Sequence, residues 1–195
     1  MSGDKKVRLG MSLSKAVRDV RKAGMKATGA WSAVYYGRPR ASHDIDFVVE
    51  LNPGDVEKLL VDLKELSDDF LVQTESIKEA IENKSMFQLI HLPTMLKLDF
   101  WLLTSKEFDK LRFKRKKKVK ILGQVMVMAT AEDTIIQKLI WFSMGKIEKH
   151  LIDAAFVYQI QKENLDKKYL EQWVKKLDLE KHYQKLEKID LEEHL

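Results

Sequence analysis

Two apolar runs of strand length that carry aspartate constrain the fold of this chain more than any other feature of its sequence. Residues 44–51 alternate and are rich in Ile, Phe and Val, which predicts a β-strand. Residues 96–103 form a second such run, and a short turn containing proline separates it from a third run at residues 86–92, which predicts a hairpin. Because such strands must bury their apolar side chains against another layer, we expect a sheet with helices packed on it.

Helical periodicity and capping residues place helices between and after these strands. A short edge or entry strand is predicted at residues 26–28, and a small hairpin around Gly123. Thr130 is the predicted N-cap of a helix whose first turn holds Glu132 and Asp133. The other ranges with a helical pattern are 12–23, 30–36, 53–66, 76–83, 147–161, 167–177 and 181–186.

The predicted fold class is therefore α/β (α+β), a mixed sheet of about four to five strands flanked by helices. We expect an α/β domain over residues 1–129 and a helical C-terminal region over residues 130–195 packed on it.

Composition excludes several classes of protein. With no cysteine, the chain forms no disulfide and no cysteine-ligated metal centre. No apolar run approaches the roughly 20 residues of a membrane span, and the first residues are polar, so we expect a cytoplasmic protein with no secretory signal and no membrane partner. The net charge of +5 attracts polyphosphates or nucleic acid at long range, but a soluble lysine-rich surface has the same charge.

Three aspartates are the candidate metal ligands. On a strand, Asp44 and Asp46 project from one face, and two adjacent carboxylates repel unless a cation lies between them. Their oxygens suit Mg²⁺ or Mn²⁺, although a solvent-exposed strand end explains the same pair. Asp99 lies in an apolar run where burial is costly unless it is paired or metal-bound, or it faces solvent together with Lys97. If the two strands are adjacent, the three carboxylates converge as two-metal nucleotidyl transfer requires.

Upstream residues are candidates for phosphate binding. Gly29 allows close approach of the backbone to a ligand, and the helix after it would point free N–H groups at phosphate, although an ordinary turn is the alternative. Arg40 would contact phosphate or neutralise the acidic cluster, and His43 neighbours Asp44. The lysine-rich run at residues 112–118 is either a nucleic-acid surface or a solvated face. The tryptophans, Trp101 among them, are expected in the core or between helices.

Together these residues resemble the nucleotidyltransferase superfamily related to DNA polymerase beta, whose pattern is a glycine pair opening a short helix, then D-x-D on a strand, then a carboxylate on a later strand. The resemblance implies a nucleotidyltransferase-like sheet with Asp44, Asp46 and Asp99 as catalytic and metal-binding residues. Ala30 stands where the family has Gly or Ser, and Ser32 is the candidate for the missing hydroxyl. The implied nucleotide-binding residues are Gly29, Ala30, Ser32, Arg40 and Lys138.

The resemblance is closer to the branch associated with abortive infection and toxin–antitoxin systems. That branch has a tyrosine or histidine, a glycine, an arginine and a threonine before its aspartates, and a later helix that opens with Glu-Asp and carries a lysine. The corresponding residues are Tyr36, Gly37, Arg40, Ser42, Glu132, Asp133 and Lys138. Asp153 matches a further aspartate of that helical region, with a structural role.

These residues are compatible with three different functions. The first is an enzyme that uses Mg²⁺ or Mn²⁺ to move a nucleoside monophosphate from a nucleoside triphosphate to a hydroxyl of protein, tRNA or a small molecule. The second is a non-catalytic nucleotide- or partner-binding module of a toxin–antitoxin type system, which the alanine after Gly29 would explain. The third is a basic RNA-binding protein with incidental aspartates. The preferred base, the acceptor and the oligomeric state are not specified by the sequence.

Overall fold

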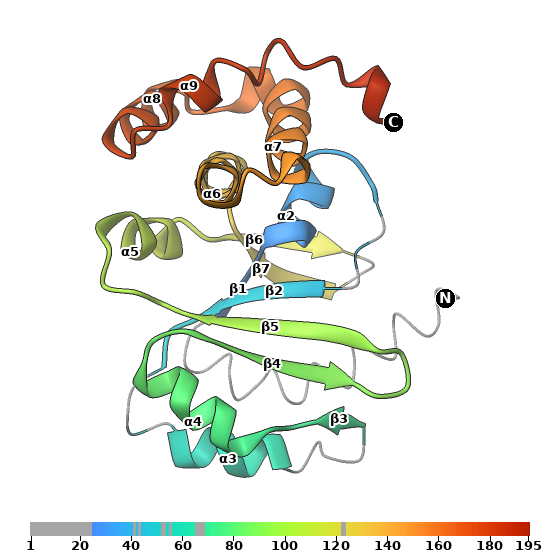
Figure 1. The fold of residues 1–195 in the computed structure, drawn as a ribbon, viewed down its shortest axis with the longest axis vertical. Coiled ribbons are helices and arrows are strands. Elements are labelled where there is room, and N and C mark those ends of the chain that lie inside the picture. Colours follow the sequence, from blue (N-terminus) through green and yellow to red (C-terminus); the bar gives the residue numbers. More distant parts are fainter. Residues whose placement is uncertain are drawn as a thin grey trace.

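The computed structural model describes residues 25–40, 42, 44–51, 54, 56–64, 69–121 and 124–195. Within this part of the chain one seven-stranded sheet has helices on both faces, and the C-terminal helices form a further layer at one end (Figure 1). The helix predicted at residues 12–23, His43 and the hairpin tip at Gly123 lie outside the described residues.

The strands are β1 (Met25–Thr28), β2 (Asp44–Val49), β3 (Phe70–Leu71), β4 (Met86–His91), β5 (Leu96–Leu102), β6 (Lys117–Ile121) and β7 (Gln124–Met128). The helices are α2 (Gly29–Tyr36), α3 (Val56–Lys64), α4 (Thr74–Glu82), α5 (Glu107–Lys114), α6 (Ala131–Gly145), α7 (Glu148–Gln161), α8 (Lys167–Lys176) and α9 (Glu180–Tyr183). Two short 3₁₀ turns, η2 (Lys162–Asn164) and η3 (Glu192–His194), follow α7 and α9.

The sheet is mixed, in the order β3-β4-β5-β2-β1-β7-β6, so the predicted α/β class is confirmed. The pairs β2–β5 and β1–β7 are parallel and the others are antiparallel. The predicted number of strands was too low, because the two-residue β3 is too short to show a period and the β6–β7 hairpin joins the same sheet. The strand predicted at residues 26–28 is present as β1, but it does not lie at an edge of the sheet, since β1 is between β2 and β7.

One face of the sheet forms a lower core with α3 and α4. The alternating residues Ile45, Phe47 and Val49 of β2 are almost fully buried on this face. Phe47 and Phe87 both stack on Phe100, with ring centroids 5.2 and 5.0 Å apart. Because successive side chains of a strand point to opposite faces, burying this set directs the intervening residues of β2 to the other face.

The opposite face is covered in part by α2, α6 and α7 (Figure 1), which form an upper core. Helix α6 is its centre, with Ile135, Ile136 and Leu139 fully buried. Met128 of β7 and Ala33 of α2 pack into the same core, so residues on both sides of the predicted boundary at 129/130 share it. The division into two domains stays a prediction.

The start of α6 is fixed by polar contacts. Thr130 is its N-cap, as predicted, and its hydroxyl accepts a hydrogen bond from the backbone N–H of Asp133 at 3.2 Å. The carboxylate of Asp133 accepts from the hydroxyl of Tyr169 at 2.7 Å, and that of Glu132 accepts from the backbone N–H of Asp166 at 3.1 Å. These contacts join α6 to α8, so the side chains of Glu132 and Asp133 stabilise the packing of these two helices.

No helix in the described residues is long and apolar enough to cross a bilayer.

Truncation of the upper core tests this packing. Leu139→Ala removes a fully buried side chain and is expected to lower the free energy of unfolding by about 2 to 5 kcal/mol. Ile160→Ala is the control, because Ile160 on α7 is 51% exposed, and its effect should stay within about 0.5 kcal/mol. Urea unfolding followed by circular dichroism measures both, and equal losses in the two variants would contradict the position of α6.

Candidate active site

Asp46 and Asp99 lie side by side on the face of the sheet opposite the lower core. Strands β2 and β5 are parallel and in register, so that Asp46 pairs with Asp99 and Asp44 pairs with Lys97. Paired residues of neighbouring strands project from the same face of a sheet. The two strands that carry the predicted carboxylates are therefore adjacent, and their register brings Asp46 and Asp99 together.

The carboxylate of Asp46 is held by two N–H donors from different elements. Its Oδ2 accepts from the backbone N–H of Ala30 at 3.2 Å, and its Oδ1 accepts from Nε1 of Trp101 at 3.3 Å. Burial raises the pKa of the Asp46 carboxyl, and the charge of Asp99 acts in the same direction, against the two hydrogen bonds. A cation beside Asp46 would relieve this cost of keeping the carboxylate charged.

Asp99 and Asp44 differ in their surroundings. Gln88 of β4 pairs with Asp99 in the sheet, and its Nε2 donates to Oδ1 of Asp99 at 2.7 Å. At the start of β2, the hydroxyl of Ser42 donates to the backbone carbonyl of Asp44 at 3.0 Å. Ser42 thus shapes the entry to the strand that carries the aspartates.

The pair formed by Asp46 and Asp99 fits a magnesium ion by its chemistry. Carboxylate oxygens are the ligands that Mg²⁺ takes, and an oxygen that accepts one hydrogen bond keeps further acceptor capacity. No group of three or more His, Cys, Asp or Glu side chains that could hold a metal ion is found in the described residues. An ion at Asp46 and Asp99 would thus take its other ligands from water and phosphate, and the metal-binding role of Asp44 stays a prediction.

Gly29 lies directly against Asp46. Its φ is +62°, and a Cβ atom built on it would lie 1.9 Å from Oδ2 of Asp46. Only glycine fits this position, which brings the first turn of α2 onto the carboxylate. The buried hydroxyl of Ser32 donates to the carbonyl of Gly29 at 3.2 Å, so it holds the turn from within. A phosphate contact for Ser32 stays a prediction.

Arg40 and Lys138 meet at Asp153 of α7. Nε and Nη2 of Arg40 bind Oδ1 and Oδ2 of Asp153 at 3.0 and 2.8 Å, and Nζ of Lys138 binds Oδ2 at 2.7 Å. Burial alone would raise the pKa of Asp153, but the hydrogen bond from Arg40 and the charge of Lys138 outweigh it and lower the pKa. Burial lowers the pKa of Lys138. Lys138 has one carboxylate partner, Asp153, whereas Asp153 has two cationic partners.

This ion group carries one net positive charge if all three side chains are ionised. Lys138 lies close enough to Asp46 for their charges to interact, so the group borders the carboxylate pair. The structure brings together the two predicted cations through Asp153, and their contact with a triphosphate stays a prediction.

Two residues of the site, Trp101 and Gln88, were not predicted from the sequence. Trp101 was expected in the core or between helices, but it is 38% exposed and its indole N–H is bonded to Asp46. The alternation of β5 contains the signal, since Trp101 is two residues beyond Asp99 and shares its face. Gln88 follows from the hairpin, because the pairing of β4 with β5 sets it opposite Asp99.

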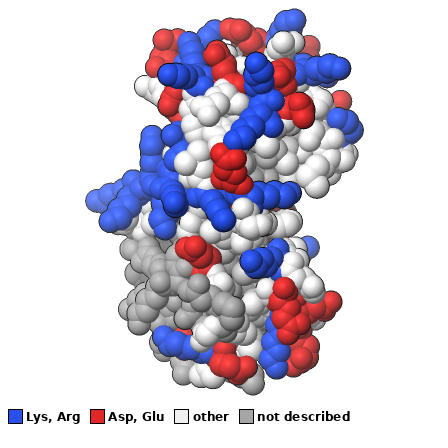
Figure 2. Space-filling model, turned by 90° about the vertical axis from the view of Figure 1, so that its left-hand side faces the viewer, with Lys and Arg blue, Asp and Glu red and all other residues white. Residues whose placement is uncertain are grey.

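The lysine-rich run contains arginines that pair with carboxylates of the protein and lysines that are exposed to solvent. Arg112 is buried and its Nε binds Asp109 at 2.7 Å, while Nη2 of Arg115 binds Glu132 at 3.3 Å. The exposed residues are Lys110, Lys114, Lys116, Lys117, Lys118 and Lys120, on α5, on β6 and between them. They belong to the side on which α5 lies in Figure 1, where Figure 2 shows a band of Lys and Arg across the middle of the molecule.

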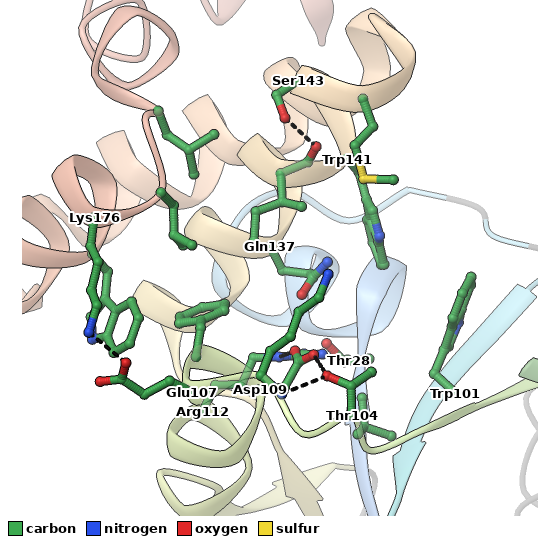
Figure 3. Close-up of a pocket in the computed structure, with 18 of the residues that line it drawn as sticks. Thr28, Trp101, Thr104, Glu107, Asp109, Arg112, Gln137, Trp141, Ser143 and Lys176 are labelled. Carbon is green, nitrogen blue, oxygen red and sulfur yellow. Dashed lines mark hydrogen bonds and ion pairs between the residues drawn. The ribbon is translucent and has the colours of Figure 1, made fainter. Parts of the chain in front are cut away.

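A cavity of about 570 Å³ adjoins the carboxylates (Figure 3). It lies between the sheet, α5, α6 and α8, and its wall includes Thr28, Val48 and Trp101. Thr28 pairs with Asp46 in the sheet, and Trp101 donates to Asp46, so the cavity and the carboxylate pair share a boundary.

Comparisons with known proteins find similarity in the fold and none in the sequence families. No family model matches the sequence, and no curated protein is similar to it. The antibiotic-resistance factor ANT(2'')-Ia superposes with a TM-score of 0.51 at 10% identity, over 91% of this chain and 97% of its own. JHP933 from Helicobacter pylori has a TM-score of 0.50 at 18% identity, over 93% and 74%. An antigenic nucleotidyltransferase-like protein from Paracoccidioides brasiliensis has a TM-score of 0.50 at 15% identity, over 88% and 90%.

Substitution of Gly29 tests the contact between the turn and the carboxylate. Gly29→Ala is expected to lower the free energy of unfolding by about 1 to 3 kcal/mol, because the added Cβ is strained at positive φ and overlaps Asp46. Gly54→Ala is the matched control, since a Cβ there meets nothing within 4 Å. Thermal unfolding measures both, and equal melting temperatures for Gly29→Ala and the wild type would rule out the close approach.

Substitution of Asp153 tests the ion group. Asp153→Asn leaves two buried cations without their carboxylate and should lower the free energy of unfolding by about 3 to 5 kcal/mol at neutral pH. Since the pKa of Asp153 is lowered in the folded protein, its contribution is present above the ordinary pKa of aspartate and is lost as the pH falls through the lowered value.

The difference in stability between the wild type and Asp153→Asn should therefore shrink at acid pH. Denaturant unfolding of both proteins across the acid range measures it, and a difference independent of pH would contradict an ionised Asp153.

Proposed function

We propose that this chain, whose fold is that of a nucleotidyltransferase, moves a nucleoside monophosphate from a nucleoside triphosphate to a hydroxyl acceptor with the help of a divalent metal. The observation that carries the proposal is the pairing of Asp46 with Asp99 on adjacent parallel strands, with the glycine turn of α2 directly against Asp46. Strand register and a glycine that admits no side chain bring this group together from three separate parts of the sequence.

Asp46 and Asp99 are the residues that would hold Mg²⁺ or Mn²⁺, with Asp44 as a further candidate two residues earlier on β2. The bound metal would neutralise charge on the triphosphate and lower the pKa of the attacking hydroxyl. The raised pKa of Asp46 supports this role, because a buried carboxylate beside another acid gains from a cation.

The first turn of α2 would bind the phosphates. Gly29 has no side chain, so phosphate oxygens could approach its backbone, and helix N-termini favour anions. Ala30 contacts Asp46 through its backbone N–H, a contact that does not depend on the side chain at this position. Arg40 and Lys138 would supply positive charge, with Asp153 holding them in place.

The reaction requires one bond to form and one to break. The acceptor oxygen would bond to the α-phosphorus, the bond from that phosphorus to the bridging oxygen would break, and pyrophosphate would leave. Asp99, oriented by the amide of Gln88, is the group we expect to take the proton of the acceptor hydroxyl.

The acceptor remains protein, RNA or a small molecule. The exposed lysines of α5 and β6 favour RNA among these, because a surface of one charge sign attracts polyanions.

Two observations favour a second function, a non-catalytic nucleotide- or partner-binding module of the toxin–antitoxin type. Both carboxylate oxygens of Asp46 already accept N–H groups, and no metal-binding group of three side chains is gathered in the described residues. Such a module would bind a triphosphate without releasing pyrophosphate.

A transfer assay tests the proposal. The full chain is incubated with Mg²⁺ or Mn²⁺, each labelled nucleoside triphosphate and cell-extract protein or RNA, and both pyrophosphate release and label transfer are followed. Asp46→Asn and Asp99→Asn should each lower the rate roughly a thousandfold, because several kcal/mol of transition-state stabilisation are lost. Asp69→Asn is the matched control, because Asp69 is exposed beside β3, away from the pair.

Equal rates in all four proteins would rule out the proposed site. Metal-dependent binding of triphosphate that is lost in Asp46→Asn, with no pyrophosphate release from any protein, would favour the non-catalytic module.

A further inference from the structure

The cavity beside the carboxylates is placed to receive part of a ligand whose phosphates lie at Gly29. Thr28, which lines the cavity, immediately precedes Gly29, and Val48 of the wall is two residues beyond Asp46 on the same face of β2. The cavity volume of about 570 Å³ is within the range of small-ligand sites. A molecule that extends from the glycine turn along the sheet would enter this space.

The amide of Gln137 is a polar group of the cavity wall that is placed to meet a ligand. Gln137 lies on α6, its residue is only 8% exposed, and in Figure 3 its amide points into the cavity. No hydrogen bond to this amide is formed by any residue of the described chain, although an amide has both donors and acceptors to satisfy. Because this amide faces the cavity, a ligand with a donor beside an acceptor could bond to both of its polar atoms.

Two indole rings form the side of the cavity next to Asp46. Trp101 of β5 and Trp141 of α6 stand together in Figure 3, opposite Glu107 and Lys176, with ring centroids 6.4 Å apart and planes tilted by 41°. Trp101 is 38% exposed, whereas Trp141 is half-buried and its ring already lies 5.3 Å from that of His150. An indole face that is open to the cavity can stack on a flat ring. Trp101 also donates to Asp46, so a ring bound here would lie next to the metal-binding pair.

Four of the five charged residues of the wall are paired with one another, and the fifth, Lys106, is exposed. Asp109 accepts from Arg112 and from Thr104, and Glu107 is paired with Lys176 at 2.6 Å. These pairs leave the cavity with little demand for an ionic ligand. Its wall therefore suits a flat, neutral ring that carries hydrogen-bonding groups on its edge.

We propose that this cavity binds the nucleobase of the triphosphate, with the indoles of Trp101 and Trp141 against the ring and the amide of Gln137 at its hydrogen-bonding edge. This inference rests on the proposed function, since it assumes that the phosphates lie at Gly29. Each nucleobase presents a donor next to an acceptor, and the amide of Gln137 satisfies either order by turning over. The site thus distinguishes a nucleotide from a bare polyphosphate.

Isothermal titration of the full chain tests the proposal, with ATP, GTP, CTP, UTP and inorganic tripolyphosphate in the presence of Mg²⁺. The wild type should bind at least one nucleoside triphosphate about tenfold or more tightly than tripolyphosphate. Gln137→Leu and Trp141→Leu should each reduce that advantage by about tenfold and leave the affinity for tripolyphosphate unchanged.

Trp141→Phe keeps an aromatic face and should keep most of the advantage. Gln184→Leu is the matched control for Gln137, because Gln184 is exposed and does not line the cavity. Unchanged thermal unfolding of each variant shows that it is folded.

Each other outcome overturns the inference in a recognisable way. Nucleoside triphosphates that bind no better than tripolyphosphate would overturn the nucleobase site and leave the proposed function standing. Variants that keep full nucleotide affinity but transfer less label to the acceptor would assign the cavity to the acceptor instead. Variants that lose tripolyphosphate binding as well would show that the residues act on the phosphate site. Absence of any metal-dependent binding in the wild type would overturn the proposed function together with this inference.

Discussion

Burial of alternate residues of β2 and β5 under α3 and α4 is the constraint on which the site depends. Ile45, Phe47 and Phe100 can all be buried in one register only, since a shift by one residue would bring the aspartates into the lower core. An unpaired carboxylate in an apolar core is costly enough to exclude that register. The stacked aromatic rings below the sheet therefore hold Asp46 and Asp99 together above it.

Polar contacts between segments distant in the sequence complete the arrangement above the sheet. Asp153 of α7 binds Arg40, which precedes β2, and Lys138 of α6, so it links the segment between α2 and β2 to the C-terminal helices. Trp101 links β5 to the same region, because its indole contacts both Asp46 and the cavity below α6. Charge and aromatic surface thus meet at the border between the sheet and the helices.

Local signals accounted for most of the elements. The alternation in β2, the hairpin of β4 and β5 and the N-cap at Thr130 were all predicted, because strand period, turn and capping chemistry act over a few residues. The two-residue β3 and the central place of β1 were not, because both depend on partners distant in the sequence. At the site, the aspartates and Gly29 were found from their pattern, whereas the indole of Trp101 was assigned to packing.

The sequence by itself determined which residues carry charge among apolar neighbours, and hence the candidate set of Asp44, Asp46 and Asp99. Tertiary structure alone decided that Asp46 pairs with Asp99 and touches the Gly29 turn, that Asp153 holds Arg40 and Lys138, and that the amide of Gln137 faces a cavity. The physical reason is that periodicity fixes the face on which a side chain lies, whereas its neighbour on that face is set by strand order and helix packing. These bring Arg40 and Asp153 together across 113 positions of the sequence.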